Sequence, residues 1–181
     1  MKSAGTTHTA WRLERIVSGG QTGVDRAALD VALELGIPCG GWCPKGRRAE
    51  DGLIPEAYPL NESPTANYAE RTALNVKDSD GTLILSRGPL RGGTALTKTF
   101  AERYRRPYLV VELRDATPQL IHEWLSENSI RILNVAGPRE TSQPGITRQA
   151  ATFLRALFGN PSPKRKRGNE ASVPRLRVGL V

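Results

Sequence analysis

Residues 15–36 read RIVSGGQTGVDRAALDVALELG, and this stretch decides the fold. Residues 15–18 predict a short strand that runs into glycines. The apolar spacing that follows predicts a helix from about Asp25 to Leu35. One face of that helix carries Ala28, Val31, Ala32 and Leu35. A strand that turns through glycines into a helix is typical of the opening of a βαβ unit.

The same alternation continues along the chain. Further strands are expected at 38–42, 82–85, 108–113 and 130–135, and further helices at 67–76, 94–104, 118–127 and 145–158. Residues 43–64 are rich in proline, glycine and charge, and are expected to form one long loop. Short strands alternating with helices predict a parallel sheet with right-handed crossovers and helices on both faces. We therefore expect a single α/β domain, doubly wound and mainly parallel, as a Rossmann-like three-layer sandwich.

The length of 181 residues suits one such domain. We place it at residues 15–158, between an N-terminal extension at 1–14 and a tail at 159–181. Apolar runs fall short of the roughly 20 residues that a membrane helix needs. The extension lacks an apolar signal-peptide segment, and two cysteines do not make a disulfide scaffold. These features favour a cytoplasmic protein that does not bind membranes.

Most of the net charge of +8 belongs to the tail, which holds six basic residues and one acid and therefore carries +5. Its apolar residues follow no helical or strand period. We expect a disordered extension of no specific role. The alternative is that the run Lys164–Arg167 binds nucleic acid or serves as an import signal.

Loops that follow the strands are the candidate ligand site, because ligands bind beyond the carboxyl ends of parallel strands. The loops at 19–24, 43–55, 86–93 and 136–144 are rich in glycine and polar residues, whereas the connections at the opposite edge are plainer. Two of these loops lead into a helix start, where free amides and the helix dipole attract an anion. Asp25 is expected to cap its helix and not to meet a ligand, and Thr94 either caps its helix or binds the ligand.

The predicted binding residues are the glycines and polar side chains of these loops: Gly19, Gly20, Gln21, Thr22, Gly23, Arg26, Lys45, Arg47, Ser86, Gly92, Gly93, Thr94, Arg139 and Ser142. Arg139 offers a planar fork for phosphate or carboxylate, and its alternative is a surface ion pair with Glu140. Cys39 and Cys43 have poor spacing for zinc and are expected as buried or half-buried thiols. The sequence shows no nucleophile–base pair, so no catalytic or metal-binding residue is predicted.

Four stretches together resemble the molybdenum cofactor carrier family. They read IVSGGQTGVDRAALD at 16–30, WCPKGRRAEDG at 42–52, RGGT at 91–94 and NVAGPRE at 134–140, the last running on to PGI at 144–146. The resemblance covers roughly residues 14–158. It implies a Rossmann-like fold, often a homo-oligomer. It also implies binding of molybdenum cofactor (molybdopterin), a pterin with a phosphate and a dithiolene-held metal, for delivery to molybdoenzymes.

The chain also resembles, more weakly, the phosphoribohydrolases long labelled lysine decarboxylases, which carry P-G-G-x-G-T-x-x-E after the same strand. Residues 90–97 read LRGGTALT, so the second Gly-Thr and the Glu are missing. Three functions remain open: a carrier of an anionic pterin cofactor, a protein that binds or processes a nucleotide, such as an enzyme that cleaves its N-glycosidic bond, and a domain that binds some other anion. The enzyme needs a carboxylate near the ribose, and the candidates are Asp25, Glu50, Asp51 and Asp80.

Overall fold

The computed structural model describes residues 12–159 and the backbone of residues 177–179. The strands are β1 Arg15–Val17, β2 Cys39–Cys43, β3 Arg48–Ala49, β4 Gly52–Leu53, β5 Leu60–Glu62, β6 Gly81–Ser86, β7 Tyr108–Glu112, β8 Ile132–Ala136 and β9 Arg177–Gly179. The helices are α1 Val24–Glu34, α2 Tyr68–Lys77, α3 Gly92–Arg103, α4 Pro118–Glu127 and α5 Ile146–Phe158. Every strand and helix expected within residues 15–158 is confirmed, with ends shifted by at most two residues.

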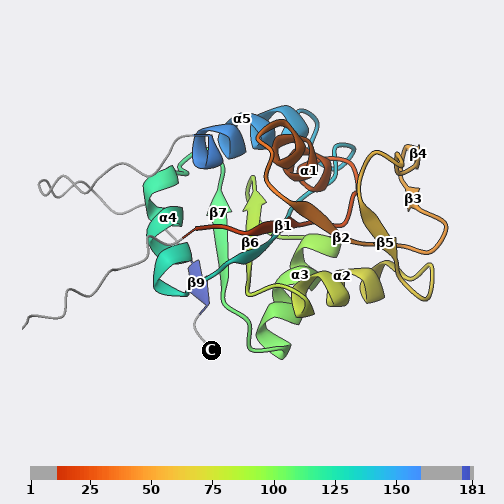
Figure 1. Ribbon diagram of the computed structural model, residues 1–181, viewed down its shortest axis with the longest axis horizontal. Helices are drawn as coiled ribbons and strands as arrows, with labels where there is room; N and C mark the ends of the chain where they lie inside the picture. The colour runs from red at the N-terminus through yellow and green to blue at the C-terminus, as the bar shows by residue number, and fades with distance from the viewer. Residues whose placement is uncertain (1–11, 160–176, 180–181) are drawn as a thin grey trace, which may run out of the picture.

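The main sheet has the strand order β5-β2-β1-β8-β6-β7-β9, in which all neighbours are parallel except the antiparallel pair of β7 and β9. Helices α1, α4 and α5 cover one face and α2 and α3 cover the other (Figure 1). The doubly wound three-layer sandwich is therefore confirmed. All six residues of the inner strand β6 are buried, as a strand covered on both faces requires.

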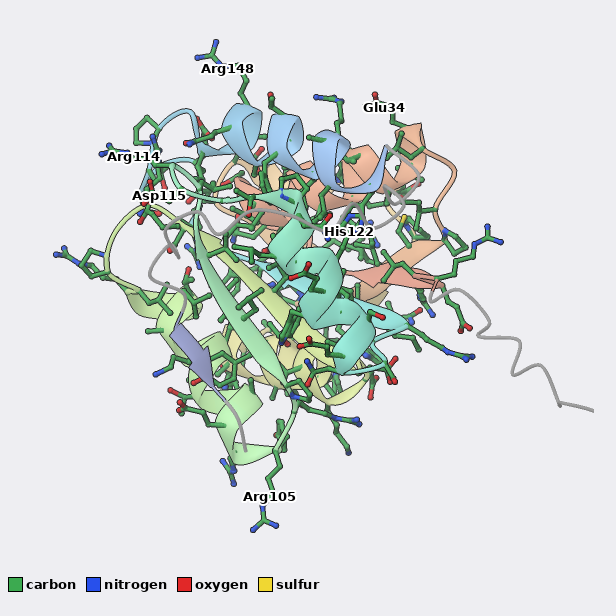
Figure 2. The ribbon with its side chains drawn as sticks, turned by 90° about the vertical axis from the view of Figure 1, so that its left-hand side faces the viewer. Glu34, Arg105, Arg114, Asp115, His122 and Arg148 are labelled. Atoms are coloured by element: carbon green, nitrogen blue, oxygen red, sulfur yellow. The ribbon has the colours of Figure 1, made fainter. Side chains whose placement is uncertain are left out.

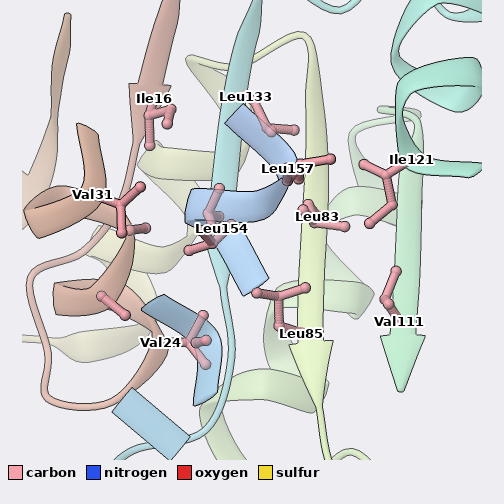
Figure 3. Close-up of a cluster of buried hydrophobic side chains, with 14 of the residues drawn as sticks. Ile16, Val24, Val31, Leu83, Leu85, Val111, Ile121, Leu133, Leu154 and Leu157 are labelled. Carbon is pink, nitrogen blue, oxygen red and sulfur yellow. The ribbon is translucent and has the colours of Figure 1, made fainter. Parts of the chain in front are cut away.

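The larger core lies between the sheet and the layer of α1, α4 and α5. Strand residues such as Ile16, Leu83 and Leu133 meet the helical residues Val31 and Leu154 there, and all five are fully buried (Figure 3). A smaller cluster on the opposite face joins α2 and α3 to β7. The amphipathic helices thus cover both faces of the sheet, and the loops lie at the edge where the parallel strands end.

Residues 43–64 are not the single loop that the sequence predicts. β3 and β4 form an antiparallel hairpin, and β5 extends the sheet beside β2. Local alternation is too short there to predict strands of two or three residues. Arg47 holds the segment together, because its guanidinium donates hydrogen bonds to the backbone oxygens of Ile54, Pro55, Tyr58 and Leu60.

The expectation for the tail differs from the structure at residues 177–179. These residues form β9, which pairs with β7, although the sequence shows no strand period there. The basic run Lys164–Arg167 and the N-terminal residues 1–11 lie outside the described residues. Among the helices that are described, none is long and apolar enough to cross a membrane.

The prediction that Asp25 and Thr94 act as helix N-caps is wrong for both residues. The N-cap positions of α1 and α3 are Gly23, which has no side chain, and Arg91, whose side chain makes no capping bond. Asp25 and Thr94 instead lie within the first turns. The Asp25 carboxylate is directed to Arg71 of α2, at 2.9 Å between Oδ2 and Nη1.

Glu140 caps α5 and makes no ion pair with Arg139. Its carboxylate accepts hydrogen bonds from the amide of Gly145 and from the amide and hydroxyl of Thr147. These bonds lower the pKa of Glu140. At the far end of the same helix, the oxygen of Leu157 lies 2.7 Å from Nε2 of His122 on α4, away from the ligand edge (Figure 2).

We expect Glu140→Ala to lower the free energy of unfolding by about 1–2 kcal/mol at pH 7, because α5 loses its cap. The carboxylate stabilises the fold above its unfolded-state pKa of about 4.3. This contribution is lost as the pH falls through the lower folded-state pKa. In urea unfolding at pH 7, 4 and 3, the difference in the free energy of unfolding between wild type and variant should therefore shrink as the pH falls. Glu56→Ala, in an exposed loop, is the control; a difference that is constant with pH would contradict the assignment.

Candidate functional site

A cleft of about 620 Å³ opens at the carboxyl ends of β1, β6 and β8. β8 lies between β1 and β6, and the helices that follow those two strands, α1 and α3, cover opposite faces of the sheet. Loops diverge at such a point and leave a crevice between them. Eight predicted binding residues line it: Gly19, Gln21, Ser86, Gly92, Gly93, Thr94, Arg139 and Ser142.

The start of α3 forms one end of the cleft. Gly92 and Gly93 are exposed, and a Cβ atom added to either would meet no atom within 4 Å. The first amides of a helix have no partner within the helix. The open space at Gly92 and Gly93 lies beside Arg91, whose side chain is exposed and lines the cleft. This end therefore offers backbone donors, the positive end of a helix dipole and a guanidinium.

Arg139 and Arg87 bring further positive charge to the same cleft. The Arg139 guanidinium lies over the ring of Tyr68, 5.3 Å from its centroid, so it is held at the rim and makes no ion pair with Glu140. Arg87 donates to the backbone oxygens of Gln143 and Pro144, each at 2.9 Å. The Arg87 bonds tie the loop after β6 to the loop after β8.

A buried ion pair forms the floor. Asp25 of α1 and Arg71 of α2 meet beyond the end of β1, with 7% and 13% of their side chains exposed. Burial raises the pKa of Asp25, and the neighbouring Arg71 guanidinium opposes that rise. Gly19 is required here for close approach, because a Cβ atom at this position would collide with the Arg71 guanidinium.

Gln21 lies beside this pair, with its carboxamide fixed in orientation. Its Oε1 accepts hydrogen bonds from the amides of Thr22 and Glu50, both at 3.0 Å. The Glu50 carboxylate in turn accepts bonds from the Thr22 hydroxyl and from the amide and hydroxyl of Thr141. Burial alone would raise the pKa of Glu50, but these bonds hold it below its ordinary value. The β3–β4 hairpin thus fastens two of the ligand-edge loops together.

Six predicted binding residues do not line the cleft: Gly20, Thr22, Gly23, Arg26, Lys45 and Arg47. Arg26 pairs with Asp51, at 2.5 and 2.7 Å, and Arg47 is occupied by the backbone oxygens of its own loop. Gly20 and Gly23 have positive φ angles, and a Cβ atom there would strike Leu60 or the backbone of Pro138. These residues shape the loops, and the sequence alone does not separate that role from ligand binding.

Helix α2 supplies lining residues that the sequence analysis missed, namely Tyr68, Arg71, Thr72 and Asn75. Asn75 bonds both the amide and the oxygen of Trp42, and so clamps α2 to β2. The sequence does carry one signal, since Thr72 lies four residues before the apolar Val76 in the predicted helix 67–76 and so shares its face. A polar residue on a buried helix face requires a partner. The position of α2 across the end of β1 depends on tertiary packing alone.

The two cysteines are both free thiols on β2, with Cys39 half-buried and Cys43 buried, which confirms their predicted environment. Burial raises the pKa of each thiol. Within the part of the chain that is described, no group of three or more His, Cys, Asp and Glu residues is placed to hold a metal ion.

Comparisons with known proteins agree with this architecture. The model of the "Circularly permutated YpsA SLOG family" matches residues 16–158. The crystal structure of a "Putative molybdenum carrier protein" from Syntrophus aciditrophicus is 49% identical, with a TM-score of 0.78, and the match covers 81% of this chain and 95% of that one. No curated protein sequence matches. The chain therefore belongs to the circularly permutated YpsA SLOG family, in agreement with its resemblance to molybdenum carriers.

Proposed function

We propose that this protein is a carrier that binds molybdenum cofactor, a pterin phosphate with a dithiolene-held metal, in the cleft between α1 and α3. The observation that supports this most directly is the charge of the cleft. Four arginines line it, and Asp25, already paired with Arg71, is the one acid among its described lining residues. Such a cleft favours an anionic ligand of small size.

The phosphate is assigned to the start of α3. Gly92 and Gly93 leave open space at the helix start, and Arg91 and Arg139, which line the same cleft, would supply charge-assisted hydrogen bonds. Thr94, within the first turn, adds a hydroxyl at the same end. A phosphate with two negative charges and several acceptor oxygens matches this set of donors.

We assign the pterin to the floor of the cleft. Nε2 of Gln21 and Nε of Arg71 are buried and have no hydrogen-bond partner among the described residues. Both residues line the cleft, so a polar heterocycle would supply what these donors lack. The bound cofactor would bring its metal and dithiolene, while the protein's part is to bind the ring and phosphate and to exclude water.

The nucleotide-cleaving alternative finds less support. Of its four candidate carboxylates, Asp51 is paired with Arg26 and Asp80 bonds the amides of Arg131 and Ile132 at the opposite edge of the sheet. Glu50 is held by threonines outside the cleft lining. Asp25 alone lines the cleft. As a carrier, the protein would pass its cofactor to molybdoenzymes, and the family resemblance favours a homo-oligomer.

Mass spectrometry of the small molecules that co-purify with the protein tests the proposal directly. We expect a pterin phosphate, detectable also by the fluorescence of its oxidised ring. Release of free base from nucleoside monophosphates on incubation would instead support the enzyme. Co-purification of a nucleotide without turnover would overturn the pterin assignment and leave a nucleotide-binding protein.

Gly93→Val should weaken binding of a phosphorylated pterin by at least tenfold and leave the fold intact. Its branched side chain would fill the open space at the start of α3, since a Cβ atom at Gly93 meets no neighbour within 4 Å. Ala95→Val is the matched control, because Ala95 lies two residues further along α3 and outside the cleft lining. Calorimetric titration gives the affinity and thermal unfolding checks the fold. Equal affinity of the two variants would rule out phosphate binding at this helix start.

Arg139→Ala should lower the affinity about ten- to hundredfold, since a charge-assisted hydrogen bond contributes about 1.5–3 kcal/mol. Arg139→Lys should restore only part of it, because lysine keeps the charge but loses the planar fork. Arg148→Ala is the control, since Arg148 of α5 extends into solvent (Figure 2). If Arg139→Ala binds within about twofold of the wild type, the arginine does not contact the ligand.

A further inference from the structure

Two buried N–H donors in the cleft floor have no partner. Nε2 of Gln21 and Nε of Arg71 are both inaccessible to solvent and make no hydrogen bond to any described residue. Gln21 as a whole is 3% exposed, and both residues line the cleft. Gln143 of the same lining also carries a buried unpartnered oxygen, Oε1. Buried polar groups in folded proteins are almost always satisfied, so the lining offers two donors and one acceptor to a polar ligand.

The orientation of Gln21 is set by the protein and not by the ligand. Both hydrogen bonds to its Oε1 come from backbone amides, those of Thr22 and Glu50. A flipped carboxamide would turn its NH₂ group against those two donors. The Gln21 side chain is therefore confined to the arrangement in which Nε2 is left for a ligand.

A carboxylate accompanies these donors. Both hydrogen bonds that Asp25 accepts end on Oδ2, from Nη1 of Arg71 at 2.9 Å and from the amide of Gln21 at 3.4 Å. Asp25 thus joins the Arg71 side chain and the Gln21 backbone at the end of β1, and each of its two partners carries one of the unsatisfied donors. A ring that carries an oxo group next to a ring N–H complements this arrangement: the oxo oxygen accepts and the N–H donates.

We infer that Gln21 and Arg71 bind the oxo group of a fused heterocycle, beside Asp25, and so select rings with an O=C–N–H edge over rings with an amino group in that place. Pterin, guanine and hypoxanthine share this edge. Adenine and 4-aminopteridines present an N–H₂ group there, which would leave both donors facing another donor. The inference rests on the proposed function only in placing a ligand in this cleft.

Two ligand pairs that differ by one oxo-to-amino exchange test the selectivity. The first is 6-hydroxymethylpterin against 2,4-diamino-6-hydroxymethylpteridine, and the second is inosine monophosphate against adenosine monophosphate. Calorimetric titration should show at least tenfold tighter binding of the oxo member in each pair that binds. Equal affinity within a pair, preference for the amino member, or no binding by either pair would overturn the inference.

Gln21→Glu is the sharpest variant, because it keeps the acceptor oxygen for Thr22 and Glu50 and replaces the NH₂ donor by an oxygen. The tenfold preference should fall to about twofold or less. Arg71→Lys provides a second test that adds no negative charge near Asp25; it retains a cation for Asp25 and removes the Nε–H donor. It should reduce the preference as well, while thermal unfolding shows whether each variant folds.

Gln149→Glu is the matched control, since Gln149 is a glutamine of α5 that lies outside the cleft lining. It should leave the oxo preference unchanged. A preference that survives in both folded variants, Gln21→Glu and Arg71→Lys, would overturn the inference. Selective binding of inosine monophosphate without binding of the pterin would support the inference and refute the carrier proposal, so the two failures are distinguishable.

Discussion

The buried ion pair between Asp25 and Arg71 is the interaction on which the cleft depends. Asp25 belongs to α1 on one face of the sheet and Arg71 to α2 on the other, and they meet beyond the end of β1. Loss of one partner would leave a buried charge uncompensated, at a cost of about 3–5 kcal/mol. The pair also fixes the identity of Gly19, which alone leaves room for the guanidinium.

The arginines of the cleft divide into two groups with different tasks. Arg71 and Arg87 are tied to protein groups, the first through Nη1 to a carboxylate and the second through Nη2 to two backbone oxygens, although Nε of Arg71 has no protein partner among the described residues. Arg91 is exposed and Arg139 rests on the face of Tyr68. The positive charge that a ligand meets therefore depends on how each guanidinium is bonded, and much less on the net charge of the chain.

Much of the fold can be predicted from patterns in the sequence. The apolar run 82–85 predicts a strand and forms the centre of β6, and the helical spacing at 145–158 predicts a helix and forms α5. The ligand edge also follows, since parallel strands bring their loops together. The roles of individual arginines do not. The sequence predicts that Arg26, Arg47 and Arg139 all bind the ligand. In the structure Arg26 is paired with Asp51, and Arg47 donates to backbone oxygens of its own loop. The contribution of α2 to the cleft and the pairing of β9 with β7 arise from contacts between distant segments, and local periodicity carries no information about such contacts.

The position of β8 has a consequence for how the chain folds. β8 lies between β1 and β6, and Ser18, just beyond β1, bonds the oxygen of Val135, 117 residues away. The half-sheets β5-β2-β1 and β6-β7 are each built from segments close in sequence, but they share no edge until β8 enters between them. Such long-range pairing requires closure of large loops before any stabilisation is gained. Insertion of β8 is thus the step that should limit the folding rate, and it is also the step that creates the cleft.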